Sequence, residues 1–216
     1  GNGHVVLVTG EPGMGKSRLL ETFAERTRDE RRRLLRCQCT PYHRNSVLFP
    51  FRMLLRQTLE IDGNAHLAVH MDAVGQALAE VGRGARSSTL LLAELLEVPS
   101  EDRLSPTEMT AIQRRDETLA ILADVLMAPL EGPVLLLLED AHWSDQTTQT
   151  LIERLLKRIE HERALVMVSY RPELKPAWPE HPHATLLTCK PFGVEQCGAL
   201  IRRVASRMRI DDAMVQ

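Results

Sequence analysis

The stretch Gly10-Glu-Pro-Gly-Met-Gly-Lys-Ser17 most constrains how this chain of 216 residues can fold. It follows residues 4–9, His-Val-Val-Leu-Val-Thr, which are apolar and β-branched without polar alternation and therefore predict a strand buried on both faces. After it, apolar residues such as Leu20 and Phe23 recur at helical spacing. The chain must therefore pass from a buried strand through a glycine-rich turn directly into a helix.

This turn has the spacing G-x-x-x-x-G-K-[ST], and its place between a strand and a helix is typical of a phosphate-binding P-loop. Its glycines allow successive N–H groups to point at phosphate oxygens, and the helix dipole favours negative charge there. The lysine can reach the β- and γ-phosphates, and the serine hydroxyl can bind Mg²⁺. An ordinary glycine-rich turn with a surface lysine is the less favoured interpretation. The residues expected to bind nucleotide are Glu11, Pro12, Gly13, Met14, Gly15, Lys16, Ser17 and Arg18.

Net charge and hydropathy argue against several classes of partner. The formal net charge is −2 and the pI is about 6.5, which gives no electrostatic case for direct nucleic-acid binding or for an anionic membrane. Apolar runs such as 134–138 are too short to span a bilayer, and the sequence opens on a strand, so we expect neither a membrane segment nor a signal peptide. A cytoplasmic location is the resulting prediction.

Cysteines and histidines give no sign of a metal site. No cysteine pair has C-x-x-C spacing, and His181 and His183 lie in a proline-rich loop away from any such pair. We therefore expect reduced core thiols. The four cysteines are Cys37, Cys39, Cys189 and Cys197.

Periodicity and turn signals divide the rest of the chain into alternating strands and helices. Further strands are expected at 34–39, 134–138, 164–169 and 184–187. Helices are expected at 51–60, 67–81, 89–96, 110–127 and 195–208, with breaks at 82–84, 99–106 and 129–133, and another helix is expected to begin after Ser144 or Asp145 as its cap.

Buried strands alternating with helices predict a mainly parallel sheet, whose ligands bind at the carboxyl ends of the strands. Polar groups lie at three such ends: the P-loop after the first strand, Glu139 and Asp140 after the third, and Arg171 after the fourth. An apolar run followed by two acids is typical of a Walker B strand, which binds Mg²⁺ and orients water. Arg171 is either a surface charge or a group that contacts the γ-phosphate and so distinguishes ATP from ADP.

Four segments, in this order, resemble a known family: GEPGMGKSRLLE, LRCQCTPYHRNSVLFPF, LLLLEDAHWSDQTTQTLIERL and VMVSYRPEL. They look like the AAA-type ATPase domain of STAND regulators, which are signal-transduction ATPases. The similar modules are those attached to class III adenylate/guanylate cyclases and to large ATP-dependent bacterial transcriptional regulators. The resemblance spans about residues 4–207, and residues 140–145 are its most specific part.

The resemblance implies an α/β P-loop NTPase (ASCE) fold. This is a three-layer α/β/α arrangement with a mainly parallel five-stranded sheet in the order 5-1-4-3-2, plus a helical insertion. It also implies ATP or ADP with Mg²⁺ as cofactors. By position, Pro191 matches the proline that lies against the adenine. The implied catalytic residues are Asp140 (the water-polarising acid), Glu139, Lys16 and Arg171 (the sensor arginine). The implied Mg²⁺ ligands are Ser17, Glu139 and Asp140.

Two departures from the family pattern affect these expectations. The acid pair often runs Asp then Glu, whereas this chain has Glu139 then Asp140, which leaves the division of roles open. The sequence also lacks the Gly-Arg-Glu segment that usually precedes the first strand, and it stops inside the helical lid. We therefore expect an excised module with a P-loop ATPase core at 1–190, an insertion at 61–129 and a truncated lid at 191–216.

The function predicted from the sequence is an ATP-binding, slowly hydrolysing switch domain of a multidomain signalling or transcription regulator. Its expected partners are nucleotide, an effector domain outside this chain (a cyclase or a helix-turn-helix domain), and other copies of itself in an ATP-dependent manner. One alternative is a non-catalytic interaction module that holds ADP as a structural ligand. A nucleotide or sugar kinase is another, which the acid pair and the strand-four arginine disfavour because they suit water as the attacking group.

Overall fold

The computed structural model describes residues 3–28, 31–61, 67–99, 109–129 and 132–208. Within these ranges, five parallel strands form one sheet in the order β2-β3-β4-β1-β5. Read from the other edge, this is the expected order 5-1-4-3-2, and it confirms the predicted P-loop α/β fold. The strands are β1 (His4–Thr9), β2 (Arg33–Gln38), β3 (Val134–Glu139), β4 (Ala164–Tyr170) and β5 (Ala184–Thr188).

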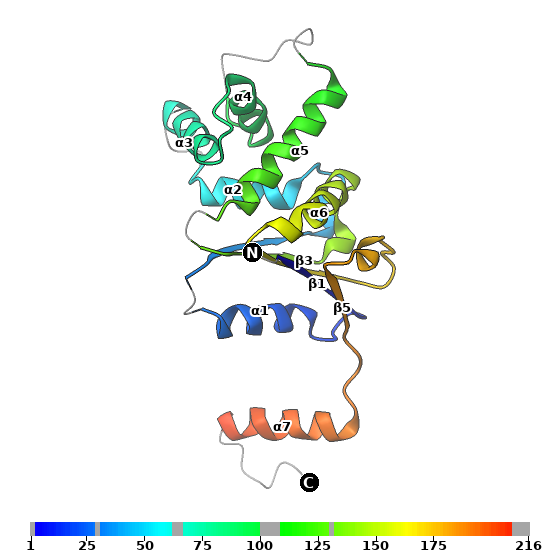
Figure 1. The fold of residues 1–216 in the computed structure, drawn as a ribbon. Helices are drawn as coiled ribbons and strands as arrows, with labels where there is room; N and C mark the ends of the chain where they lie inside the picture. Colours follow the sequence, from blue (N-terminus) through cyan, green and yellow to red (C-terminus); the bar gives the residue numbers. More distant parts are fainter. Residues whose placement is uncertain (1–2, 29–30, 62–66, 100–108, 130–131, 209–216) are drawn as a thin grey trace.

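Helices cover both faces of the sheet (Figure 1). α1 lies on one face, α2, α5 and α6 lie on the other, and α3 and α4 stack beyond α2 beside α5. The helices are α1 (Lys16–Arg26), α2 (Phe49–Thr58), α3 (Leu67–Glu80), α4 (Arg86–Leu95), α5 (Ala111–Met127), α6 (Gln146–Arg158) and α7 (Val194–Met208). Short 3-10 turns lie at Pro41–His43, Ala141–Trp143, Ile159–His161 and Trp178–Glu180.

The sheet separates two hydrophobic cores of unequal size. The larger core joins one face of the strands to the helical layer and includes Phe51 of α2 and Leu122 of α5, both fully buried. The smaller core, between the sheet and α1, contains Leu20 of α1 and Leu137 of β3. Successive side chains of a strand point to opposite faces, so the run of four leucines in β3 supplies both cores. This explains the apolar run without alternation in the sequence.

Asp145 caps the N-terminus of α6, one of the two caps expected from the sequence. Its carboxylate accepts hydrogen bonds from the backbone N–H groups of Thr147 and Thr148, at 2.9 and 3.1 Å, and from the Thr148 hydroxyl. It also accepts a bond of 3.1 Å from the backbone N–H of Leu48, the residue that precedes α2. The same carboxylate therefore fixes the start of α6 and the entry to α2.

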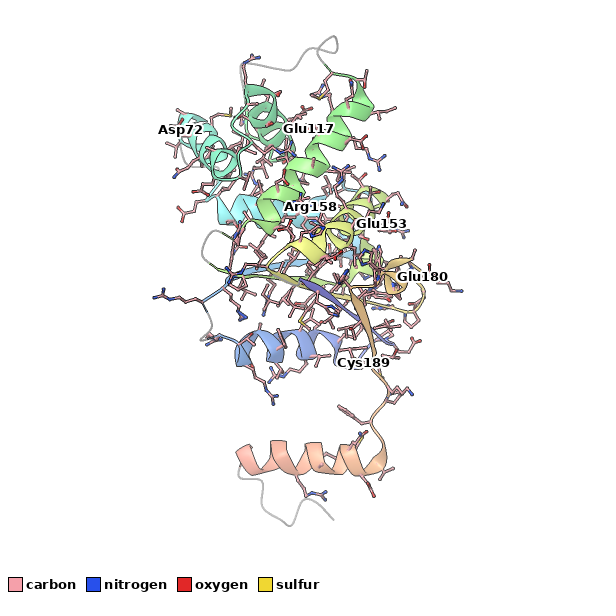
Figure 2. The ribbon with its side chains drawn as sticks, in the orientation of Figure 1. Asp72, Glu117, Glu153, Arg158, Glu180 and Cys189 are labelled. Atoms are coloured by element: carbon pink, nitrogen blue, oxygen red, sulfur yellow. The ribbon has the colours of Figure 1, made fainter. Side chains whose placement is uncertain are left out.

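An ion-pair network joins the loop after α3 to α5 and α6. Asp124 of α5 accepts a hydrogen bond of 2.6 Å from Nε of Arg83 and another from Arg158 of α6. Arg83 also pairs with Glu117 at 2.6 Å, and Arg158 pairs with Glu162 at 2.8 Å. Figure 2 shows Glu117 and Arg158 on these two adjacent helices. The network ties the outer helices to the layer that packs on the sheet.

α7 lies beyond α1, at the end of an extended segment that follows β5 (Figure 1). Its described apolar side chains are largely exposed: Val194 is 91% exposed and Ile201 is 56% exposed. The prediction of four core thiols is correct for Cys37 and Cys39 but wrong for Cys197, which is exposed like the described apolar side chains of α7. Cys189, which Figure 2 labels near the end of β5, is only partly buried.

Element boundaries differ from the sequence expectations by up to three residues. α2 begins at Phe49 rather than residue 51 because Pro50 fits the first turn of a helix, where no intrahelical N–H bond is needed. α4 begins at Arg86 rather than residue 89, with Ser88 buried. Most of the break expected at 99–106, the middle of the turn at 129–133 and the end of the lid at 209–216 lie outside the described residues. Among the described helices, none has the length and apolar character needed to cross a membrane.

Candidate functional site

The loop between β1 and α1 has the backbone conformation that its glycines suggest. Gly13 and Gly15 have φ of 78° and 79°, in the left-handed region that side chains disfavour. A Cβ at either position would meet no atom within 4 Å, so the backbone conformation, rather than crowding, favours glycine there. Gly15 is the N-cap of α1, which places the positive end of the helix dipole at the loop.

Lys16 is folded into this loop and is only 7% exposed. Its ammonium donates hydrogen bonds to the backbone carbonyls of Gly10, at 2.7 Å, and Glu11, at 2.9 Å. Both partners are neutral, so no carboxylate bonded to the ammonium compensates its charge. An anion in the loop would face this cation and the first N–H groups of α1 together.

Asp140 begins the turn after β3 in a left-handed conformation, with φ of 56° and ψ of 42°. Its backbone N–H donates a hydrogen bond of 3.0 Å to the hydroxyl of Ser169, which is fully buried near the end of β4. Its carboxylate accepts a bond of 3.1 Å from the side-chain amide of Gln38, the last residue of β2. Residues from the two strands beside β3 thus hold Asp140 at the carboxyl edge of the sheet.

Glu139, the last residue of β3, lies on the face of the sheet that α1 covers. Leu135 and Leu137 of the same strand belong to the α1-side core, and alternation along the strand places Glu139 on that face. Glu139 and Asp140 therefore differ in setting, one at the end of the strand and the other in the left-handed turn that follows. The P-loop precedes α1 on this same face.

Arg171 follows β4 and lies beside the aromatic end of the turn after β3. Its guanidinium carbon is 5.8 Å from the centroid of the Trp143 ring, within the range of a cation–π contact. The His142 ring is 5.0 Å from the Trp143 ring, and neither of its buried ring nitrogens has a hydrogen-bond partner among the described residues. Burial lowers the pKa of His142, and the positive charge of Arg171 lowers it further.

The loop, Asp140 and Arg171 border one cavity of about 310 Å³. Three basic side chains line it together with one carboxylate, and Arg18 is additionally paired with Glu21 at 3.0 Å. The cavity therefore favours an anion. Its lining consists of Pro12, Gly13, Gly15, Lys16, Ser17, Arg18, Asp140 and Arg171.

Eight of the twelve residues expected in the site thus meet around one cavity. The other four lie outside its lining: Glu11 and Met14 belong to the loop, Glu139 ends β3, and Pro191 is exposed in the segment before α7. Another hollow, of about 400 Å³, lies between β2 and α2, but no P-loop residue lines it.

The P-loop, the acidic turn and the parallel sheet agree with a comparison of the sequence with known protein families. Residues 1–168 match the family described as AAA ATPase domain. The chain belongs to this family. An AAA ATPase domain is a nucleotide-dependent module, and nucleotide hydrolysis is the activity with which its family is generally associated.

Relatives and solved structures similar to this AAA ATPase domain come from diverse organisms. A Rhizobium meliloti (strain 1021) protein described as "Uncharacterized protein R02095" is 29% identical over 203 residues, which are 94% of this chain and 19% of the relative. An Escherichia coli MS115-1 HORMA:CdnC:Trip13 complex structure matches at TM-score 0.44 and 15% identity, over 98% of this chain and 56% of the other. A Drosophila ORC structure with GC-rich DNA and Cdc6 matches at TM-score 0.41 and 11% identity, over 94% and 58%.

Sequence reasoning did not identify three residues that hold the site together. Gln38 and Ser169 bond to Asp140 from neighbouring strands, and Trp143 contacts Arg171. The parallel register pairs Gln38 with Glu139, so its position at the end of β2 was the available signal. A fully buried serine near the end of β4 is a second such signal, because a buried hydroxyl needs a partner.

Proposed function

We propose that this AAA ATPase domain binds ATP or ADP with Mg²⁺ and acts as a slowly hydrolysing switch in a larger regulator. The observation that carries the proposal is the cavity in which Lys16, Asp140 and Arg171 converge on the start of α1. Loop N–H groups, a lysine and a guanidinium suit the phosphate chain of a nucleotide. The proposed STAND type of regulator is supported by the Asp140-Ala-His-Trp-Ser-Asp145 turn.

The proposed Mg²⁺ ligands are oxygen donors, as this hard cation requires. The Ser17 hydroxyl and the Asp140 carboxylate line the cavity, and Glu139 lies on the same face of the sheet as α1. Mg²⁺ commonly takes one or two carboxylates and completes its shell with phosphate oxygens and water. When bound, the ion would neutralise charge on the β- and γ-phosphates.

We assign the protein groups to distinct tasks. Lys16 would exchange its two carbonyl partners for phosphate oxygens, and the loop N–H groups would bind the same phosphates. Asp140 would accept a proton from the attacking water or orient it, with Gln38 and Ser169 holding it in place. Arg171 would contact only the γ-phosphate, which gives ATP and ADP different contact energies and makes a switch possible.

The place of the domain in a larger protein is also a proposal. The chain spans about a fifth of the length of the curated relative that it matches. A cyclase or helix-turn-helix effector outside this chain, ATP-dependent self-association and a lid that begins near Pro191 are therefore proposed from the resemblance of the motifs. The cytoplasmic location is proposed on the same basis.

Lys16→Ala tests nucleotide binding directly. The substitution removes charge-assisted contacts worth about 1.5–3 kcal/mol, which predicts a roughly 10- to 150-fold lower affinity for a fluorescent ATP analogue. Lys157→Ala, at an exposed lysine in the last turn of α6, is the matched control and should leave the affinity unchanged. Thermal melts should show both variants folded. Equal affinity in wild type and Lys16→Ala would contradict the P-loop assignment.

Turnover distinguishes the switch from a module that holds ADP as a structural ligand. We expect slow phosphate release with excess Mg·ATP and exchange of bound nucleotide within the time of the assay. Purified protein that retains ADP through dialysis and releases no phosphate would favour the structural-ligand alternative. Transfer of phosphate to a small-molecule hydroxyl instead of water would favour a kinase.

A further inference from the structure

Arg171 lies at the edge of the cavity, beside the ring of Trp143. Its side chain lines the cavity, yet no hydrogen bond or ion pair joins its guanidinium to another residue in the described ranges. An arginine side chain has several rotatable bonds and loses much conformational freedom when a ligand orders it. A neighbour that holds a sensor arginine near the phosphate site before the nucleotide binds therefore reduces the conformational entropy lost on binding.

Trp143 is the described residue whose ring lies against this guanidinium, at 5.8 Å between the guanidinium carbon and the ring centroid. The tryptophan is itself fixed. Its backbone N–H donates a hydrogen bond of 2.9 Å to the carbonyl of Asp140, and its ring packs against the larger core and the His142 ring. A fixed aromatic face thus lies beside a flexible cation at the edge of the cavity.

We propose that Trp143 is a positioning residue for Arg171, holding the guanidinium at the cavity through its indole face so that it meets the γ-phosphate already oriented. This inference rests on the proposed nucleotide site, because it assigns a specific task to Arg171 there. The contact between Trp143 and Arg171 then couples the turn that begins at Asp140 to the sensor arginine after β4. Trp143 acts through Arg171 and need not touch the nucleotide.

A purely structural role for Trp143 makes a different prediction. If the ring only filled space against the core, its replacement would weaken ADP and ATP binding alike. A positioning role weakens binding of a non-hydrolysable ATP analogue more than binding of ADP. It also makes the loss depend on the presence of Arg171.

Calorimetric titration of both nucleotides into the full chain, with variants at Trp143, tests this. Trp143→Leu should weaken binding of the ATP analogue by about 2- to 10-fold and leave ADP affinity nearly unchanged, and Trp143→Phe should lie between wild type and Leu. In the Arg171→Ala background, Trp143→Leu should have no further effect on the affinity ratio. Phe49→Leu is the matched control, since Phe49 lies 5.5 Å from the Arg52 guanidinium but outside the cavity.

The outcomes separate this inference from the proposed function. If the wild-type protein binds both nucleotides and Trp143→Leu lowers both affinities equally, the positioning role alone is overturned. The same holds if the effects of Trp143→Leu and Arg171→Ala on the affinity ratio are additive. Wild-type protein that binds neither nucleotide would overturn both. If Trp143→Leu does not fold, tryptophan fluorescence tests the proposal instead. The ATP analogue should change tryptophan emission in the wild-type protein and not in Trp143→Phe. An unchanged response in Trp143→Phe would assign the signal to Trp178 and overturn the proposal.

Discussion

Asp124→Asn probes how firmly the outer helices are tied to the sheet layer. Asp124 is 19% exposed and its carboxylate bonds to two guanidinium groups, those of Arg83 and Arg158. The substitution keeps the shape of the side chain and removes its charge. Two fully buried charge-assisted bonds would be worth about 3–6 kcal/mol, whereas exposed ion pairs contribute less than about 1 kcal/mol.

The structure places the expected loss between these limits. Both arginines are partly exposed, and each keeps a second carboxylate, Glu117 for Arg83 and Glu162 for Arg158. We therefore expect Asp124→Asn to lower the free energy of unfolding by about 2 kcal/mol. For a chain of this size, that corresponds to a melting temperature lower by about 4–8 °C.

Thermal and urea unfolding followed by circular dichroism measure this loss. Glu94→Gln is the matched control, because Glu94 also joins two helices of this region through an ion pair, with Arg114, but is 66% exposed. The control should cost about 0.5 kcal/mol or less and shift the melting temperature by about 2 °C or less. Equal shifts in the two variants would refute the reasoning, since the network would then contribute no more than a surface pair.

Three further predictions concern the site and the thiols. Asp140→Asn should retain ATP binding and lower single-turnover hydrolysis by about 100-fold, whereas a larger loss in Glu139→Gln would reverse the assignment of the two acids. Gln38→Glu should replace the amide donor to the Asp140 carboxylate with a like charge and lower single-turnover hydrolysis; unchanged hydrolysis would mean that the two side chains are apart in the working state. Burial raises the pKa of Cys39 from its ordinary value of 9.0 to about 12, and the charges of Asp145 and Asp140 add to the shift. The folded protein therefore holds this proton more tightly than the unfolded chain does. The contribution of the neutral thiol to the free energy of unfolding is complete below pH 9 and is lost as the pH rises toward 12. Iodoacetamide should correspondingly label Cys197 in the native protein and Cys39 only after unfolding, as peptide mass analysis can check.

The sequence predicted the parts of this molecule that depend on local pattern. β1 begins and ends where its apolar run does, and Asp145, one of the two expected caps, begins α6. Strand order came from the resemblance rather than from periodicity, which does not order parallel strands. The P-loop spacing brought its residues to one cavity because the turn, the lysine and the helix start are consecutive in sequence.

Contacts between strands could not be predicted from the sequence, because they depend on strand register and on side-chain direction. Gln38 and Asp140 are 102 positions apart, and their bond exists only because β2 and β3 pair in parallel with Gln38 opposite Glu139. The contact of Arg171 with Trp143 likewise depends on where two loops leave adjacent strands. The exposure of Cys197 was missed because the apolar spacing of α7 indicates a buried face, whereas the described apolar side chains of α7 are largely exposed.

The Asp145 carboxylate links three parts of the molecule. It is the cap of α6, it accepts a bond from the residue before α2, and it follows directly on the turn that contains Asp140 and Trp143. If nucleotide displaces that turn, there are two possible outcomes. Either α2 moves with the turn, or the hydrogen bond from Leu48 to Asp145 breaks and only α6 stays attached to Asp145. Asp145 therefore joins the carboxyl edge of the sheet to the helical layer through its bonds to the start of α6 and to the residue before α2.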